Sequence, residues 1–346
     1  MRILIFHGYL LGGTGSNVYN ARLAEALAGL GHEVHLLCQE AAPEKHQFVD
    51  AVGDWDGGAL RVRTVREPVR VTVYRPDIGA LLPVYVYDRY EGFEVRTFAE
   101  CSLAEIEDYV ERNALAVGQV AARAGVEVAL ANHLVMGPAI LARALLGVPY
   151  AVKVHGSALE YSVKPDARRL LPYARAGLAP ARGVLVGSRH TAESLWAAMG
   201  DAGLPGRTRL GPPGVDVTRF ARREPAAAAA GLSELARRLA AGAEAAGEGA
   251  DGFALGGAAG GRALAGLDPR RERIVSFTGK LIVSKGVDLL LAAWPLVVEA
   301  SPRAQLVVVG FGAYREACER IVAALARGDL PTLRELAALG RAAEGG

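Results

Sequence analysis

Short apolar runs alternate with amphipathic stretches through the first 200 residues of the chain. Runs dominated by Val, Ile, Leu and Ala occur at 2–6, 33–38, 126–131, 149–154 and 183–187. Helical spacing follows the first run, over residues 17–31, and again follows each of the last three. Continuous runs of this kind are typical of strands that are buried on both faces of a parallel sheet. The pattern therefore predicts a doubly wound α/β domain.

The rest of the chain departs from this alternation twice and then returns to it. Paired β-branched stretches within 60–98 predict a hairpin-like excursion. Ala and Gly dominate residues 224–266, which predicts a weak surface helix with a flexible tail. Apolar runs at 273–279 and 304–310 resume the strand–helix pattern. The predicted organisation is an N-terminal domain over 1–210, a linker with an Ala/Gly-rich insertion over 211–266, and the start of a second α/β domain over 267–346.

Composition and charge exclude several classes of partner. The 346 residues carry a formal net charge of +2, so there is no basic excess for nucleic acid, and we predict none as a partner. The three cysteines, Cys38, Cys101 and Cys318, are far apart and lie in no C-x-x-C motif. They predict buried thiols of a reducing compartment instead of a disulfide framework or a zinc site.

The hydropathy of the chain predicts no membrane span. No stretch of 18 apolar residues occurs, and the short apolar N-terminus is followed by glycines and polar residues instead of a cleavage site. We therefore expect a cytoplasmic protein. A peripheral membrane contact stays open.

Polar residues follow the predicted strands at the edge where an open parallel sheet binds its ligands. His7, Asn132 with His133, His155, and Ser188 each come directly after an apolar run. We predict that His133 and His155 face one crevice, whereas His7 could equally be a satisfied polar residue at a loop start. Ser188, three residues before Thr191, predicts a helix N-cap, to which a ligand contact would be an addition.

A glycine-rich loop at residues 12–16 precedes the first predicted helix. Free N–H groups and the helix dipole at such a terminus favour an anion. The loop lacks the last glycine of a G-x-G-x-x-G dinucleotide fingerprint, since Val18 stands there, although Glu40 lies where a ribose-binding acid would be expected. This departure weakens the interpretation of the loop as a dinucleotide site. A tight turn with a purely structural role is a further alternative.

The segment FTGKLIVSKG brings two lysines to a second such loop. Gly279 ends the predicted strand, Lys280 and Lys285 bracket the loop, and Gly286 opens a helix. Two cations beside free N–H groups could bind a di-anion such as a pyrophosphate. The alternative is a turn with two solvated lysines.

Taken together and in order, several segments resemble the GT-B glycosyltransferases, specifically the large retaining family 4, also called glycosyl transferases group 1. The matching segments are the glycine loop with LAEALAGLGHEVHLL, then VKVHGS, VLVGSRHTAESL, GPPGVDVTRF, FTGKLIVSKGVDLLLAAW and AQLVVVGFG. The resemblance implies an α/β fold with two Rossmann-like domains, of which the second is incomplete here. It implies transfer of a sugar from a nucleotide-diphosphate-sugar donor to an acceptor hydroxyl, with no metal and no cofactor.

The resemblance also implies roles for individual residues. Those assigned to the donor phosphate and nucleotide are Gly12, Gly13, Gly279, Gly310 and Gly312. Lys280 and Lys285 would neutralise the diphosphate leaving group, and His155 matches a cleft histidine that contacts the sugar near the reacting carbon. Asn132, His133 and Ser188 would lie in the acceptor and sugar cleft.

Some positions depart from the family pattern. Lysine stands at 280, where arginine is common, and no two glutamates beyond residue 310 have the eight-residue spacing of the family's donor-sugar contacts. We therefore expect a C-terminally truncated protein that is inactive by itself. The alternatives that stay open are a catalytically silent nucleotide- or sugar-binding module and a nucleotide-sugar epimerase of the same fold; a dinucleotide oxidoreductase is disfavoured.

Overall fold

The computed structural model describes residues 1–85, 90, 92–245, 257–340 and 342. The chain divides into two compact units, Met1–Val215 and Asp216–Gly346. The Ala/Gly-rich segment belongs to the second unit.

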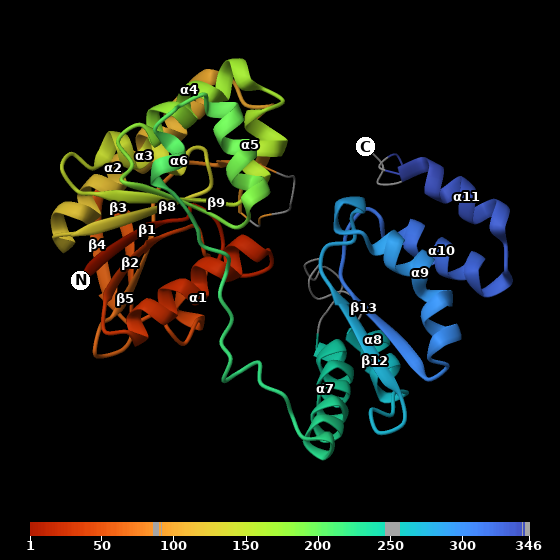
Figure 1. Ribbon diagram of the computed structural model, residues 1–346. Helices are drawn as coiled ribbons and strands as arrows, with labels where there is room; N and C mark the ends of the chain where they lie inside the picture. Colours follow the sequence, from red (N-terminus) through yellow and green to blue (C-terminus); the bar gives the residue numbers. More distant parts are fainter. Residues whose placement is uncertain (86–89, 91, 246–256, 341, 343–346) are drawn as a thin grey trace. The chain divides into compact units, whose positions relative to one another are not determined.

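Nine strands among the described residues form the sheet of the first unit (Figure 1). They are β1 (Arg2–Phe6), β2 (Glu33–Leu37), β3 (Ala51–Asp56), β4 (Ala59–Thr64), β5 (Val71–Arg75), β8 (Val128–Asn132), β9 (Tyr150–Val154), β10 (Gly183–Val186) and β11 (Thr208–Leu210). Their spatial order is β11-β10-β9-β8-β1-β2-β5-β3-β4, and every neighbouring pair is parallel except β3 with β4. The predicted parallel α/β sheet is confirmed.

Helices cover both faces of this sheet. They are α1 (Gly15–Gly29), α2 (Leu103–Ala124), α3 (Gly137–Ala144), α4 (Ala167–Leu178), α5 (Arg189–Met199) and α6 (Leu204–Arg207), with short helical turns η1 (Pro43–Lys45) and η2 (Ala158–Val163). Helix α2 shows how the sequence sets such boundaries. Ser102 and Glu105 form a reciprocal capping box at its start, and Gly125 ends it in the left-handed conformation.

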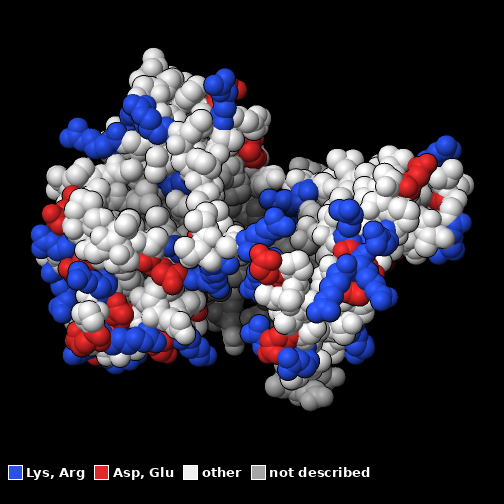
Figure 2. All heavy atoms as spheres, turned by 60° about the horizontal axis from the view of Figure 1, so that its bottom comes forward, with Lys and Arg blue, Asp and Glu red and all other residues white. Residues whose placement is uncertain are grey.

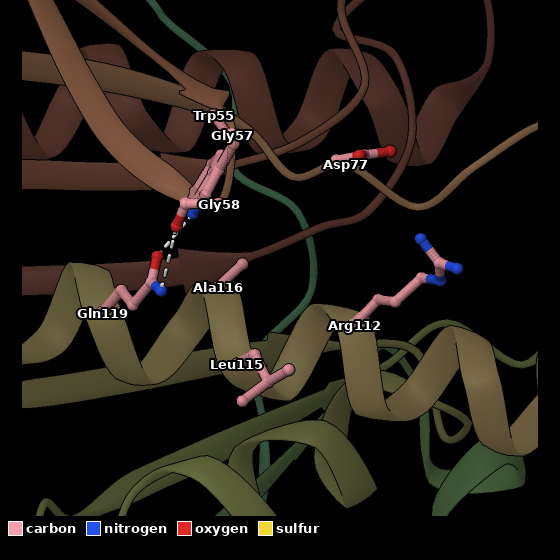
Figure 3. A pocket seen from close by; sticks show the side chains of 8 residues that line it. All are labelled: Trp55, Gly57, Gly58, Asp77, Arg112, Leu115, Ala116 and Gln119. Atoms are coloured by element: carbon pink, nitrogen blue, oxygen red, sulfur yellow. Dashed lines mark hydrogen bonds between the residues drawn. The ribbon is translucent and has the colours of Figure 1, made fainter.

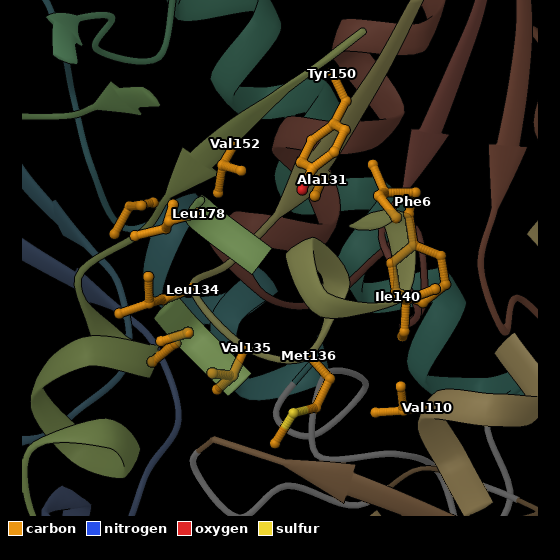
Figure 4. Close-up of a cluster of buried hydrophobic side chains, with 14 of the residues drawn as sticks. Phe6, Val110, Ala131, Leu134, Val135, Met136, Ile140, Tyr150, Val152 and Leu178 are labelled. Carbon is orange, nitrogen blue, oxygen red and sulfur yellow. The ribbon is translucent and has the colours of Figure 1, made fainter. Parts of the chain in front are cut away.

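Side chains alternate between two hydrophobic cores along β1, because successive strand residues point to opposite faces. Leu4 and Phe6 pack in the larger core, which α2 to α5 cover (Figure 4). Ile3 and Ile5 pack in the smaller core, to which α1 contributes Ala21 and Ala24. Both faces of the central strands are therefore dry, as their unbroken apolar runs require.

The prediction of a hairpin formed by the β-branched stretches within 60–98 was wrong about which strands pair. The antiparallel hairpin is formed by β3 and β4, and it starts before residue 60. The second β-branched stretch supplies β5, which lies parallel between β2 and β3 in the main sheet. Two further strands, β6 (Leu81–Val84) and β7 (Glu94–Thr97), form a small parallel sheet of their own. β-branched content predicts a strand but not its partner, which depends on what the neighbouring faces bury.

The second unit contains one parallel pair of strands, β12 (Arg273–Thr278) and β13 (Ala304–Val309), among its described residues. Its helices are α7 (Pro225–Ala245), α8 (Gly257–Ala265), α9 (Val287–Ala300), α10 (Arg315–Arg327) and α11 (Leu330–Leu339), and η3 (Val283–Lys285) precedes α9. In the Ala/Gly-rich segment a Cβ on Gly261 would lie 2.8 Å from Ala236 O, so glycine lets α7 and α8 approach closely. The predicted flexible tail falls largely on residues 246–256, outside the described residues.

Several compositional predictions can be compared with the described residues. All three cysteines are buried free thiols. No described helix is both long and apolar enough to span a membrane. On the face shown in Figure 2, Lys and Arg side chains are interspersed with Asp and Glu over both units.

Candidate active site

The topology brings three of the predicted polar positions to one edge of the first sheet. Strands β9, β8 and β1 are neighbours and run parallel, so the residues that follow them share the carboxyl edge. His155 follows β9, Asn132 ends β8 with His133 next to it, and His7 follows β1.

His7, Asn20, Asn132 and His155 are joined by hydrogen bonds and are called the His–Asn network below. Asn20 Nδ2 lies 3.0 Å from His7 Nδ1, and Asn132 Nδ2 donates to Asn20 Oδ1 at 2.6 Å. His155 Nε2 lies 3.0 Å from Asn132 Oδ1. Asn20 comes from α1, one turn beyond the glycine loop. Asn20 could not be identified from the sequence, because a helical asparagine has no distinctive spacing.

Burial keeps the histidines of this edge neutral. It lowers the pKa of His7 from 6.5 to about 4, against the opposing effect of its hydrogen bonds to Asn17 and Leu10. Burial, with smaller contributions from the charges of Lys153 and His7, lowers the pKa of His155 to about 3. The pKa of His133 is lowered well below its ordinary value, again chiefly by burial. At neutral pH these rings donate and accept hydrogen bonds but carry no charge.

His133 lies beside the network without joining it. Its backbone is left-handed, with φ of 66°, which is uncommon for a residue other than glycine. The buried ring packs at centroid distances of 4.4 Å from Tyr85 and 5.1 Å from His155, and neither ring nitrogen has a hydrogen-bond partner among the described residues. The aromatic segment 84–93, which could line an acceptor groove or pack in the core, lies partly outside the described residues, at 86–89 and 91.

The glycine loop is held from two sides. Asn17 Nδ2 donates to Gly12 O at 2.7 Å, and Gly13 has φ of 85°, a conformation that favours glycine. The space that a side chain at Gly12 would occupy is open, and the first turn of α1 carries no acidic residue. Glu40 accepts a hydrogen bond from Leu11 N at 3.0 Å. This acid therefore supports the loop, a role that the dinucleotide interpretation did not foresee.

Lys153 is a charged residue of this edge that sequence analysis missed. It lies two residues before His155 on β9, is 1% exposed, donates to Gly211 O, and places Nζ 5.5 Å from the centroid of the Tyr19 ring. Burial lowers its pKa. A lysine inside an apolar strand was the available signal, because lysine is rarely fully buried.

Ser188 follows β10, the strand next to β9. Its Oγ accepts a hydrogen bond from Thr191 N at 3.1 Å, so the predicted N-cap of α5 is confirmed. The residue is exposed. Its contact with a ligand stays a prediction.

In the second unit the two lysines flank the loop between β12 and α9. Lys280 is half-buried, with Nζ 5.7 Å from the centroid of the Phe311 ring, and Lys285 is exposed. Gly286 has φ of 68° and starts α9. A Cβ on Gly310 would lie 2.0 Å from Gly279 O, and one on Gly312 would lie 2.4 Å from Leu281 O. These two glycines are therefore required for contact between the loops that follow β12 and β13, whatever the loops bind.

A pocket of about 280 Å³ on the first unit lies away from these residues (Figure 3). It is lined by the β3–β4 turn and by α2, and a hydrogen bond from Trp55 Nε1 to Gln119 Oε1 closes one side. In the sheet β3 is separated from β1 by β2 and β5. None of the predicted site residues lines this pocket.

The D-x-D spacing of Asp54 and Asp56 on β3 also lies outside the site. Arg75 pairs with Asp54 and Arg61 pairs with Asp56. No group of three or more His, Cys, Asp and Glu residues suited to a metal ion occurs among the described residues.

Comparisons with known proteins agree with this architecture. Residues 14–214, more than half of the chain, match the family described as "Glycosyl transferase 4-like domain". A search of curated protein sequences finds no match.

Solved structures resemble the chain at low sequence identity. Sucrose-phosphate synthase from Thermosynechococcus elongatus has a TM-score of 0.52 and 18% identity over 94% of this chain and 67% of that one. HepE from Anabaena, in complex with UDP and glucose, has a TM-score of 0.47 and 14% identity over 99% and 68%. A glycosyltransferase from Rickettsia africae has a TM-score of 0.47 and 11% identity over 98% and 66%. The chain has the GT-B fold and belongs to the glycosyl transferase 4-like family.

Proposed function

We propose that the chain takes part in transfer of a sugar from a nucleotide-diphosphate-sugar donor to an acceptor hydroxyl, with retention of anomeric configuration and without a metal. In this proposal the first unit holds the acceptor and the reacting sugar ring. The loops that follow β12 and β13 hold the donor diphosphate. Retention, the donor class and the residue roles come from the family resemblance.

The observation that carries the proposal is the neutral, hydrogen-bonded His155 at the shared edge of β1, β8 and β9. A neutral imidazole can bind a sugar hydroxyl without repelling the positive charge that develops at the anomeric carbon. Ligands of open parallel sheets bind at this edge. The match of residues 14–214 to the glycosyltransferase family supports the same assignment.

Charge separation in the reaction explains the two lysines. The bond from the anomeric carbon to the diphosphate breaks, a bond to the acceptor oxygen forms, and the acceptor's hydroxyl proton passes to the departing diphosphate or to water. Negative charge grows on the departing diphosphate. Lys280 and Lys285 beside the N-terminus of α9 would stabilise it in position, without a proton transfer of their own.

Binding of nucleoside diphosphates by the whole chain tests this assignment first. UDP, GDP and ADP are titrated separately by calorimetry, and we expect one of them to bind. Lys285→Ala should weaken that binding about tenfold or more, because a charge-assisted contact is lost. Lys285→Arg is the matched control that keeps the charge. Equal affinity of all three proteins would contradict the diphosphate assignment.

Turnover is the second measurement. Acceptor-dependent release of nucleoside diphosphate would demonstrate transfer, and Lys285→Ala should then slow release by orders of magnitude. Binding without release would favour the silent binding module. If the chain neither binds a nucleoside diphosphate nor releases one, both the transferase and the silent binding module are contradicted.

A further inference from the structure

Main-chain carbonyl groups fix the direction of the hydrogen bonds at one end of the His–Asn network. Asn20 Nδ2 donates to Ser16 O at 2.9 Å, and Asn17 Nδ2 donates to Gly12 O at 2.7 Å. A carbonyl oxygen can only accept, so the amide nitrogen of each asparagine must face it. The backbone therefore determines the orientation of both side-chain amides.

The fixed amide of Asn20 determines the proton position on His7. The same Nδ2 that faces Ser16 O also faces His7 Nδ1 at 3.0 Å, so Nδ1 must accept. The proton of the neutral ring is then on Nε2, which lies 3.0 Å from both Leu10 O and Asn17 Oδ1. Both of those oxygens are acceptors, which agrees with a donating Nε2–H.

The opposite end of the Asn20 amide sets the remaining directions. Asn20 Oδ1 can only accept, so Asn132 must face it with Nδ2, at 2.6 Å. Asn132 Oδ1 is then directed to His155 Nε2 at 3.0 Å, and that nitrogen must carry the proton. In the neutral ring Nδ1 of His155 has the free lone pair, and no described residue donates a hydrogen bond to it.

We propose that Asn20 and Asn132 are positioning residues that hold His155 as the tautomer protonated on Nε2, so that Nδ1 accepts a hydrogen bond from a substrate hydroxyl. The contact with substrate rests on the proposed glycosyltransferase function, whereas the tautomer does not. Asn20 acts entirely through Asn132, since its own bonds are to Ser16, His7 and Asn132.

Burial gives this control its strength. His7, Asn20 and Asn132 are each at most 1% exposed. Reversing one amide would place two donors or two acceptors face to face, and an unsatisfied buried polar group is costly. One hydrogen bond of the network can therefore reverse its direction only if the neighbouring hydrogen bond reverses as well.

Long-range ¹H–¹⁵N NMR of the whole chain tests the tautomer directly, because it distinguishes protonated from unprotonated ring nitrogens. For His155 we expect Nε2 protonated and Nδ1 unprotonated at neutral pH. Asn20→Leu removes the amide that orients Asn132, and we expect the His155 signals to shift towards a mixture of tautomers. Asn113→Leu is the matched control, because Asn113 is an equally buried asparagine that donates to Tyr109 O, outside the network.

A second variant keeps the test decisive if Asn20→Leu does not fold. Asn132→Asp retains an acceptor for His155 Nε2–H and adds a negative charge, so His155 should become protonated on both nitrogens at a higher pH than in the parent chain. A protonated Nδ1 in the parent chain would overturn the positioning role. Unchanged His155 signals in every folded network variant would also overturn it.

The substrate contact has its own readout. UDP-glucose, GDP-mannose and ADP-glucose are added one at a time, and the donor that binds should shift the His155 Nδ1 resonance as a hydrogen-bonded acceptor. A bound donor that leaves Nδ1 unchanged, with or without an acceptor sugar, would overturn this contact. If none of the three binds, the contact and the proposed function both fail, while the spectra of the free chain still decide the tautomer.

Discussion

The strand edges of the two units are built differently. In the first unit His7 after β1 and His155 after β9 are linked by hydrogen bonds through the His–Asn network. In the second unit the residues after β12 and β13 meet through glycine backbone, with Lys285 exposed at the rim. The first edge is therefore preorganised by hydrogen bonds between its side chains, whereas the second is held by close contact of its backbone.

The sheets that carry these edges also differ in how deeply their strands are buried. Strands β1 and β2 are buried on both faces, whereas most residues of β12 are exposed, including Ile274 at 36% and Val275 at 40%. Burial of apolar area is the main favourable contribution to folding. We therefore expect the first unit to be the more stable one at neutral pH.

Acid should narrow or reverse the difference in stability between the two units, and this is the largest expected effect. All seven histidines lie before residue 216. Unfolded His7 takes up a proton near pH 6.5, but folded His7 does so only near pH 4. Between these values unfolding binds protons, so the free energy of unfolding falls as pH falls; this amounts to about 3 kcal/mol for His7, and His155 adds to it.

Urea unfolding between pH 7.5 and 4.5 measures this effect. Trp294→Phe leaves Trp55 and Trp196 to report the first unit, and the converse double variant leaves Trp294 to report the second. A parallel loss of stability in both units would contradict the assignment of this effect to buried histidines.

Alanine at Gly310 should destabilise the second unit selectively. Its Cβ would lie 2.0 Å from Gly279 O, a backbone atom that cannot move without separating the loops after β12 and β13. We expect a loss of about 3 kcal/mol, the upper range for an overpacked site. Gly279→Ala is the matched control in the same loops, because its Cβ would meet only Phe277 at an ordinary 3.7 Å. Residue-resolved hydrogen exchange compares the variants, and equal protection in both would refute the close-contact explanation.

The fold was more predictable from sequence than the site. Runs such as 2–6 and 183–187 predicted β1 and β10 because a strand buried on both faces leaves a continuous apolar signal. The pairing of β5 with β2 and β3 was not predictable, since it depends on faces supplied by distant segments. In the second unit Pro295 lies inside α9, which runs from Val287 to Ala300.

Strand ends also predicted where candidate polar residues would gather, but not how they would be connected. His7 and His155 could be identified because they follow apolar runs. Asn20 and Lys153 could not, since their roles arise from contacts across α1, β8 and β9 that have no fixed spacing in the sequence. Gly310 and Gly312 were predicted for a nucleotide, whereas the structure supplies a packing reason for both.

A smaller effect on stability is expected from the N-caps of the helices, which differ between the two units. The N-cap of α5 is Ser188, whose side chain accepts a hydrogen bond from Thr191 N, whereas the N-cap of α9 is Gly286, which has no side chain to accept one. Ser188→Ala should lower the free energy of unfolding of the first unit by about 1 kcal/mol. Ser188→Asp should retain the cap. Urea unfolding through the Trp55 and Trp196 signals measures both, and equal stability of the Ala and Asp variants would show that the cap contributes nothing.

The smallest effect concerns the ring beside Lys280. Nζ of Lys280 lies 5.7 Å from the Phe311 ring centroid, within the range of a cation–π contact worth about 0.5–1 kcal/mol. Phe311→Leu keeps an apolar side chain but removes this contact, so Lys280 should be held less firmly and the affinity for a nucleoside diphosphate should fall about threefold. Phe311→Tyr retains an aromatic ring and should bind as the parent chain does. Calorimetry on the three proteins separates the outcomes: a weaker Leu variant supports a lysine oriented by its neighbour, whereas identical affinities would mean that the Phe311 ring does not orient Lys280.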